Sequence, residues 1–238
     1  MKVLENLNFL KAWNELLPEL LSSALLTVVI VTCCAIAIAF VLGFLMAMGL
    51  LSNNFIVKKL MLAVQEIIRG TPIIVQLLYM YFVVPLLIEI VAYFLGFPDL
   101  QVNLPAVTAG TLALGINYGT YFAEIIRSAI LAIDNGQTEA ALALGFSPLA
   151  ARFRIVIPQA LRNSIPVFGN YVVMMVKDTS LLAYIAVPEF ITKTKTYNAQ
   201  TFLTIESYTI LAMVYLMICI PLSGLVKILE RSLNKHRR

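Results

Sequence analysis

Charged residues are scarce in this chain: they make up 13% of its 238 residues, while 61% are hydrophobic. Soluble domains carry about 25% charged residues, so the sequence has too little charge to cover a water-exposed surface. Its mean hydropathy of +0.90 points the same way. The composition excludes an ordinary soluble domain and predicts an integral membrane protein.

Residues that bind metals or act as nucleophiles are scarce as well. Cys33, Cys34 and Cys219 lie inside apolar runs without metal-ligand spacing, and the single histidine is His236 in the basic tail. Cysteine in apolar sequence commonly serves as a small packing residue. The patterns HExxH and GxSxG are absent, and these patterns mark zinc proteases and serine hydrolases. We expect no metal site, no thiol catalysis and no intramembrane enzyme.

A phosphate-binding loop of the form GxxxxGK[ST] is also missing, because no glycine in the chain is followed by lysine. The backbone N–H groups of such a loop cradle nucleotide phosphates. We therefore expect that this chain does not bind ATP by that route. Energy for any uphill process must come from another protein.

The N-terminus lacks the uncharged apolar core of about 7–15 residues that a secretory signal needs. Charged residues from Lys2 to Glu19 instead alternate with leucines. We expect residues 1–19 to form an amphipathic helix at the external membrane surface, which the mature protein keeps.

Long apolar runs, by contrast, are abundant. A helix that spans a bilayer needs about 20 mostly apolar residues, and five segments qualify: roughly residues 20–51, 60–92, 104–126, 165–187 and 205–228. The sequence predicts an all-α membrane protein with about five transmembrane helices in a domain of residues 20–230. Because the second segment contains Pro72 and Pro85, a broken span and a count of six stay open.

Lysine and arginine are enriched in cytoplasmic loops, so their positions predict the orientation of the chain. An external N-terminus puts twelve on the cytoplasmic side (Lys58, Lys59, Arg69, Arg127, Arg152, Arg154, Arg162, Lys227, Arg231, Lys235, Arg237 and Arg238) and four outside (Lys2, Lys11, Lys193 and Lys195). The C-terminus is then cytoplasmic. We interpret the basic tail, residues 231–238, as a stop-transfer flank that binds anionic lipid, not as a site for nucleic acid.

The cytoplasmic loop at residues 132–163 contains a stretch that is less apolar than the sequence around it. Asp134 or Asn135 is placed to cap the start of a helix, and Gly145 is placed to end it. Alanines between these positions keep the helix narrow enough to enter a groove in a partner.

A second helix is predicted to begin at Ser147 and Pro148, where a capping hydroxyl precedes a proline in the first helical position. Pro158 is expected to end or kink it. The sequence thus predicts two short helices that meet at a fixed corner. A plain helical hairpin that returns the chain to the membrane is the alternative.

The same stretch contains Glu139-Ala140-Ala141, then Gly145, then Ile155-Val156-Ile157-Pro158. This pattern resembles the EAA loop of ABC-transporter permeases. The flanking runs EIIRGTPIIVQLLYMYF, YFAEIIRSAI and VFGNYVVMMVKDTSLLAYI are similar to permeases for polar amino acids. The chain departs from the pattern at Ser128, where glycine is common, and in a longer segment from Leu86 to Asn103. The resemblance covers roughly residues 20 to 230.

The resemblance implies a permease subunit of the type I ABC importer fold, whose loop forms coupling helices that dock into an ATP-hydrolysing subunit. The implied coupling residues are Glu139, Ala140, Ala141, Gly145, Phe146, Ser147, Arg152 and Pro158. It further implies two ATPase copies that bind ATP and Mg, an extracytoplasmic binding protein, and the bacterial cytoplasmic membrane as the location. About five spans are too few to surround a pathway, so we expect a second permease, identical or homologous.

A secondary, ion-coupled amino acid transporter is the alternative function. Such transporters often contain internal repeats with helices broken at matching places. The two halves of this sequence show no convincing repeat, which favours the importer.

Polar residues inside the spans are candidates for the substrate pathway, because they are costly to place in lipid. In the fourth span, Asp178 is placed to accept hydrogen bonds from a substrate ammonium group, and Thr179 and Ser180 to bond a carboxylate or to satisfy a helix break. The alternative is that Lys177 and Asp178 fix helix packing through separate partners.

Further candidates lie on the second, third and fourth spans. They are Gln76 and Tyr79, then Asn117, Tyr121 and Glu124, and Asn170. Asn117, Tyr121 and Glu124 share one helix face by their spacing. Pairing with Arg127 is the alternative role for Glu124, while an interhelical hydrogen bond and aromatic packing are the alternatives for Gln76 and Tyr79.

Overall fold

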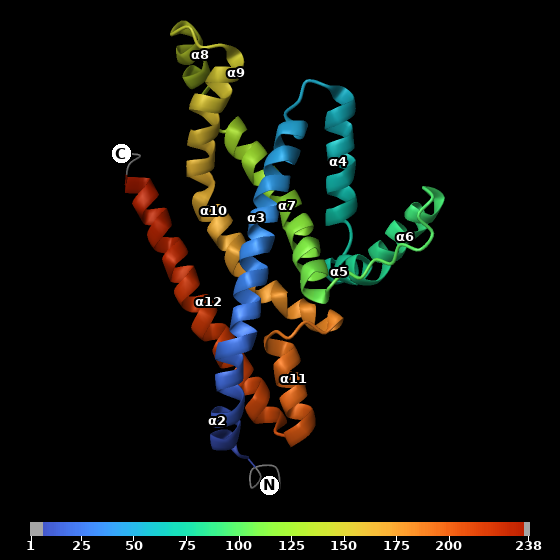
Figure 1. Cartoon of the computed structure of the whole chain (residues 1–238). Helices are drawn as coiled ribbons and strands as arrows, with labels where there is room; N and C mark the ends of the chain where they lie inside the picture. The colour runs from blue at the N-terminus through green and yellow to red at the C-terminus, as the bar shows by residue number, and fades with distance from the viewer. Residues whose placement is uncertain (1–6, 236–238) are drawn as a thin grey trace. The chain divides into compact units, whose positions relative to one another are not determined.

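The computed structural model describes residues 7–235, and this part of the chain is helical with no strand (Figure 1). In chain order the elements are α2 (Phe9–Glu19), η1 (Leu20–Ala24), α3 (Leu25–Leu50), α4 (Phe55–Arg69), α5 (Ile73–Leu78), η2 (Tyr79–Val83), α6 (Val84–Phe94), α7 (Ala106–Leu131), α8 (Asn135–Ala143), α9 (Pro148–Ala151), η3 (Arg152–Val156), α10 (Ile157–Asp178), η4 (Thr179–Ile185), α11 (Phe190–Thr201) and α12 (Thr204–Lys235). The predicted all-α fold is confirmed.

The first helix is a run of 42 residues from Phe9 to Leu50, in which α2 continues through the π-helical turn η1 into α3. Asn8 caps its start, because its side-chain oxygen accepts a hydrogen bond from the Lys11 N–H at 3.0 Å. The amphipathic helix expected at residues 1–19 overlaps α2, with residues 1–6 outside the described part. No break separates it from the first span.

Three described helices are long and apolar enough to cross a membrane: Phe9–Leu50, Ile73–Phe94 and Thr204–Leu233. The pair Pro148–Ile185 and Phe190–Thr201, bent by 50°, makes a fourth if it is one span. The remaining predicted span corresponds to α7. This helix has 26 residues, but it is not apolar enough to count among the candidate membrane spans. Its polar residues are buried in protein, with Asn117 6% exposed and Thr120 fully buried.

The second predicted span is broken at Gly70, Thr71 and Pro72, between α4 and α5. Pro72 has φ −59° and ψ 136°, so the helix cannot continue through it, and α5 begins at the next residue. The break that the prolines left open in the sequence is therefore present.

Two π-helical turns each precede a proline. η2 ends two residues before Pro85, and η3 ends two residues before Pro158. A proline ring clashes with the carbonyl four residues earlier and cannot donate a hydrogen bond to it, and a wider π-helical turn relieves that conflict. Of the two alternatives for Pro158, an end of the helix is wrong, because the chain stays helical from Pro148 to Ile185. A kink at Pro158 stays a prediction.

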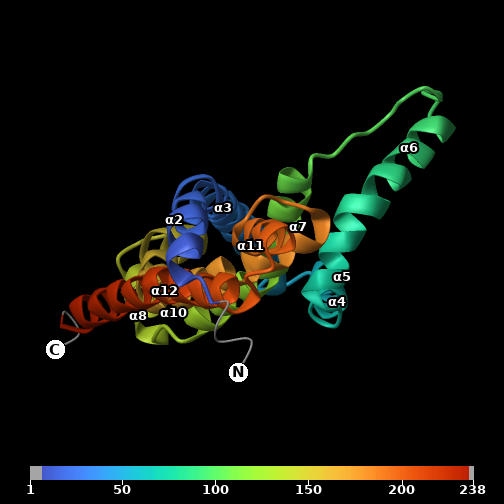
Figure 2. The ribbon, with the colours of Figure 1, turned by 90° about the horizontal axis from the view of Figure 1, so that it is seen from below.

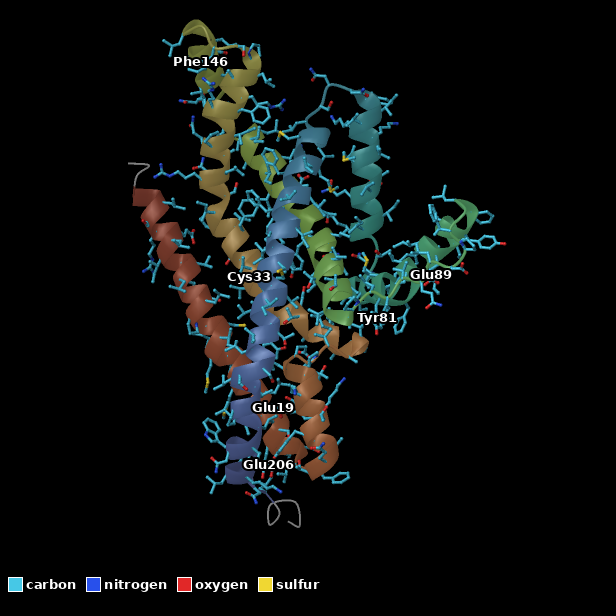
Figure 3. The ribbon with its side chains drawn as sticks, viewed as in Figure 1. Glu19, Cys33, Tyr81, Glu89, Phe146 and Glu206 are labelled. Atoms are coloured by element: carbon cyan, nitrogen blue, oxygen red, sulfur yellow. The ribbon has the colours of Figure 1, made fainter. Side chains whose placement is uncertain are left out.

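The segment after α6 is extended and turns back along that helix, as Figure 2 shows. The Val102 N–H donates to Glu89 Oε1 at 2.8 Å, which fixes the extended segment to α6. Glu89 is labelled on α6 in Figure 3. The longer stretch noted in the sequence from Leu86 to Asn103 therefore consists of most of α6 and an extended segment that runs back along it.

The chain forms two compact units. The α11 unit contains residues 7–35, 71–115 and 173–222, and the α8 unit contains residues 36–70, 116–172 and 223–235. Phe190 and Leu182, both fully buried, are among the core residues of the α11 unit.

The core of the α8 unit joins α3, α7 and α10 through Ala47, Ile126, Ile130, Val156, Ile157 and Ala160. The helices α3 and α7 approach closely beside it. A Cβ atom on Gly43 would lie 2.6 Å from the Cβ of Phe122, so only glycine fits there.

Candidate functional site

The corner between α8 and α9 begins with a capped helix. Asp134 Oδ1 accepts a hydrogen bond from the Gly136 N–H at 2.7 Å and so satisfies one of the donors that a helix start leaves open. Of the two predicted caps, Asp134 and Asn135, the structure shows Asp134 in that role.

A sharp turn ends α8 at Gly145, which has φ +83°. The Gly145 N–H donates to the Leu142 carbonyl at 3.0 Å, and the Phe146 N–H donates to the Ala141 carbonyl at 3.1 Å. These two bonds form a Schellman motif, in which glycine avoids the strain that a side chain would cause. Phe146 lies in this turn between α8 and α9 (Figure 3).

The second helix of the corner starts at Ser147, whose Oγ accepts a hydrogen bond from the Ala150 N–H at 3.2 Å. Pro148 follows at the first helical position, as predicted. Because α9 runs through η3 into α10, the corner is carried directly by a long helix. Val156 and Ile157, at the root of the corner, are buried in the core of the α8 unit.

The tip of the corner presents apolar side chains outward. Leu144 is 79% exposed and Leu149 is 67% exposed, while Ala141 packs inward. Glu139 and Ala140 are also exposed, and Arg152 is half-buried. A small, fixed helical corner with protruding leucines is suited to entering a groove in a partner.

Four predicted pathway residues belong to the α8 unit. Asn117, Tyr121 and Glu124 lie on α7, and Asn170 lies on α10. The rings of Tyr121 and Tyr171 are 5.7 Å apart, so α7 and α10 pack together beside Asn170.

Glu124 forms the ion pair that was its alternative role. Its Oε1 lies 2.6 Å from Arg127 Nη2, and its Oε2 accepts from Arg127 Nε at 3.1 Å. Both residues are on α7, three positions apart, so the pair spans less than one helical turn.

A clamp made by Gln65, Arg69 and Thr120 fixes the end of α4 to α7. Arg69 Nη2 donates to the Thr120 carbonyl at 2.6 Å, and Gln65 Nε2 donates to the same oxygen at 3.3 Å. The Arg69 guanidinium also lies 4.7 Å from the centroid of the Tyr121 ring. Helix α4, which ends at the break in the second span, is thus held to α7, on which three predicted pathway residues lie.

The other predicted pathway residues belong to the α11 unit, where α5 packs against η4. This packing places the segment with Gln76 beside the segment with Thr179 and Ser180. Gln76 Nε2 donates to the carbonyl and hydroxyl oxygens of Thr71, at 3.0 and 2.8 Å, and so stabilises the break. Tyr79 is half exposed.

Asp178 is the last residue of α10, where the helix tightens into the 3₁₀ turns of η4. Thr179 is fully buried, and its hydroxyl donates to the Val176 carbonyl at 2.7 Å. The Thr179 hydroxyl is thus hydrogen-bonded where the helix changes type, and its role in the pathway stays a prediction. Such a change of helix type within one segment often marks a hinge or functional site.

Sequence reasoning missed two features of these sites. The exposure of Leu144 and Leu149 was not predicted, because the same stretch contains other large apolar residues, including Leu142 and Phe146. Gln65 and its contact with α7 had no local signal, because the contact joins residues 55 positions apart in the sequence.

The corner lies within a much longer stretch of the chain that matches a known family. A family model described as "Binding-protein-dependent transport system inner membrane component" matches residues 39–235. This chain belongs to that family of permeases.

Relatives cover nearly the whole permease. It is 34% identical over 218 residues to the glutamine transport system permease protein GlnP of Escherichia coli, with 92% of this chain and 94% of GlnP covered. It is also 34% identical to the nopaline transport system permease protein NocM of Agrobacterium fabrum, with 94% and 91% covered.

Solved structures confirm the fold of the permease. The crystal structure of an amino acid ABC transporter with histidines matches with a TM-score of 0.80 and 32% identity, covering 95% of this chain and 99% of that chain. The MetNI methionine ABC transporter matches with a TM-score of 0.65 at 16% identity and supports the fold alone. The type I importer fold is confirmed, and the chain is a membrane subunit of an assembly that includes ATPase and binding-protein partners.

Proposed function

We propose that this permease is the membrane-spanning subunit of an ATP-driven importer for a polar amino acid. The α8–α9 corner carries the proposal, because its turn is fixed by two caps and a Schellman motif while its leucines face outward. The names of the relatives, which include permeases for glutamine, nopaline and L-cystine, support an amino acid as substrate.

The corner docks into an ATPase subunit on the cytoplasmic side. The ATPase binds ATP and Mg, since this chain has no phosphate-binding loop. Two ATPase copies and a second permease, identical or homologous, complete a two-fold assembly. The N-terminus lies outside the bacterial cytoplasmic membrane and the C-terminus in the cytoplasm, as the lysine and arginine distribution favours.

ATP-driven closure of the ATPases moves the corner, and the corner moves the helix that runs from Pro148 to Ile185. Because that helix is continuous, displacement at the corner reaches Asp178 and the 3₁₀ turns that follow it. The external binding protein delivers substrate to the opposite side. No residue of this chain sets the direction, so import rests on the family.

The docking role is tested by Gly145→Pro and Glu139→Lys. Gly145→Pro cannot adopt the positive φ of the turn, and Glu139→Lys reverses the charge on the exposed face of α8. Both variants should insert into the membrane yet lose uptake and bind the ATPase more weakly. Uptake at the wild-type rate by either variant would contradict the docking role.

The substrate contact is tested by Asp178→Asn, which keeps the size of the side chain and removes its charge. Uptake of the amino acid, or ATP hydrolysis stimulated by the loaded binding protein, should fall while the ATPase stays bound. Gln76→Leu is the comparison variant. It removes the hydrogen bond from Gln76 to Thr71 at the break in the second span and leaves Asp178 unchanged. An Asp178→Asn variant with unchanged uptake would assign Asp178 to helix packing.

A further inference from the structure

A cavity of about 370 Å³ lies at the root of the corner, within the α8 unit. Its lining comes from the turn before α8, from α8 itself, from α10 and from the end of α12, and includes Asp134, Gln137, Gln159, Arg162, Asn163 and Leu233. Sites for small molecules typically measure about 300–1,000 Å³. The volume suits one metabolite with a few waters.

The cavity contains charged groups of both signs. The side chains of Arg162 and Asn163 are exposed and have no hydrogen bond or ion pair to any residue in the range 7–233, over which the structure describes side chains. Asp134 uses Oδ1 to cap α8, and its other carboxylate oxygen has no partner in the same range. A guanidinium offers a planar fork of donors that fits a carboxylate, and a carboxylate accepts from an ammonium group.

One wall of the cavity is already fixed. Gln159 Nε2 donates to Gln137 Oε1 at 3.2 Å and to the Ile155 carbonyl at 3.0 Å, which joins α10 to α8 across the cavity. Preorganised polar groups lower the entropy that a ligand loses on binding. The exposed groups of Asp134 and Arg162 therefore lie beside a pair of helices that one side-chain bond already joins.

We propose that this cavity is a regulatory site for a free α-amino acid on the cytoplasmic side, which binds its carboxylate to Arg162 and its ammonium group to Asp134. The proposal rests on the proposed function, because it requires the corner to be cytoplasmic and the transported amino acid to be released there. The presence of Asp134 beside the basic group favours a zwitterion over an acidic side chain of a partner protein.

Binding at this site opposes transport. A bound amino acid connects the start of α8 to α10 and to the end of α12, and so resists the movement of the corner that ATP hydrolysis drives. The importer consequently slows as its product accumulates inside. This is product inhibition through the permease itself.

The test uses the whole complex in proteoliposomes that contain ATP, with the loaded binding protein and labelled amino acid outside. Unlabelled L-glutamine, its α-amide or N-acetyl-L-glutamine is enclosed with the ATP, and the initial rate of uptake is measured. L-glutamine should slow uptake several-fold, whereas the amide lacks the carboxylate and the acetylated form lacks the ammonium group, so neither should inhibit.

Two variants locate the effect. Arg162→Gln and Asp134→Asn should each raise the inhibitory concentration about tenfold or more, which is the usual effect of losing a charged hydrogen bond. Asparagine caps a helix as well as aspartate does, so Asp134→Asn leaves α8 intact. Arg231→Gln is the matched control, since Arg231 is exposed near the end of α12 and does not line the cavity.

Inhibition that is unchanged in both variants, or shared equally by the amide and the acetylated form, overturns the proposal. Weaker ATPase binding by Arg162→Gln without any enclosed amino acid also overturns it and makes the cavity a protein contact. Wild-type complex that transports but is not inhibited rejects the regulatory site alone. Wild-type complex that does not transport any amino acid rejects the proposed function.

Discussion

The α8–α9 corner and α11 are both short helical elements between long apolar ones, yet they are held in different ways. α11 is held by side chains at its start and along its length. Glu189, fully buried, accepts hydrogen bonds from the N–H groups of Ile191 and Thr192 at 2.9 and 2.7 Å. α11 is therefore capped within the protein interior.

Further bonds tie α11 to α2 within the α11 unit. Lys193 Nζ lies 2.6 Å from Glu19 Oε1, and the Tyr197 hydroxyl donates to Glu15 Oε2 at 3.0 Å. Glu19, the last residue of α2, is labelled in Figure 3. These contacts join residues more than 170 positions apart and give α11 a fixed place in its own unit.

The corner has few such bonds. Among the described residues, its side-chain hydrogen bonds are the two caps at Asp134 and Ser147 and the contact between Gln159 and Gln137. Its leucines are exposed, whereas α11 buries Phe190 completely. The contacts of α11 are made within this chain, and the difference is consistent with the proposal that a partner covers the corner.

The largest effect is expected from Leu144→Glu combined with Leu149→Glu, which should detach the ATPase. Burying a leucine stabilises an interface by about 1.5–3 kcal/mol, so losing both weakens binding by more than about a hundredfold. Copurification of the ATPase and amino acid uptake should both be lost. Thermal unfolding of the permease should not change, because neither side chain is buried in it.

The control for that pair is Asn135→Glu, which adds negative charge to the first turn of α8, where the helix dipole favours it. This variant should keep the ATPase. If the double leucine variant also keeps the ATPase, the tip of the corner is not the docking surface. The contrast with α11 would then say nothing about partner binding.

The mirror-image result is expected for Glu189→Ala. It removes the cap of α11, and loss of a capping side chain typically costs about 0.5–2 kcal/mol. Thermal unfolding of the purified permease should begin at lower temperature, while ATPase binding should stay at the wild-type level. Glu189→Gln keeps one carbonyl oxygen to accept these bonds and should be affected less.

Weaker ATPase binding by Glu189→Ala with no change in thermal unfolding would reverse the comparison. It would show that α11 communicates with the docking surface. The same purified samples serve both measurements, so stability and assembly are compared directly.

Local features of the corner could be predicted from the sequence. Asp134, Gly145 and Ser147 act through bonds to residues at most five positions away, and capping rules depend only on such neighbours. The break at Pro72, which the sequence left open as one of two alternatives, also has a local cause, because proline disrupts helix hydrogen bonding. Pro158 was harder, because a proline ends a helix or follows a wide turn depending on what the rest of the helix packs against.

Long-range features could not be predicted. The bond from Arg69 to Thr120 joins two helices, and no spacing rule connects them. The burial of Glu189 and Thr179 depends on packing of distant segments, so the sequence shows only that the residues are polar. For the same reason, the pathway roles of Asp178 and Gln76 stay predictions.

A smaller effect is expected from Ser147→Ala at the corner. Loss of a serine cap costs about 1 kcal/mol, which should loosen the start of α9 and weaken ATPase binding about fivefold. Ser128→Ala is the control, because its hydroxyl donates to the Glu124 and Ile125 carbonyls within a helix and caps nothing. Equal loss of ATPase binding in both variants would show that the Ser147 cap is not the cause.

The smallest effect is expected from Lys193→Met, which breaks the ion pair with Glu19. The side chains are 27% and 43% exposed, and ion pairs of this kind contribute at most about 1 kcal/mol. Thermal unfolding of wild type and variant should differ slightly at low salt and become equal at high salt, because salt screens exposed charges. A large shift that persists in high salt would mean that this pair is a main fastening of α11, and that the buried Glu189 is not.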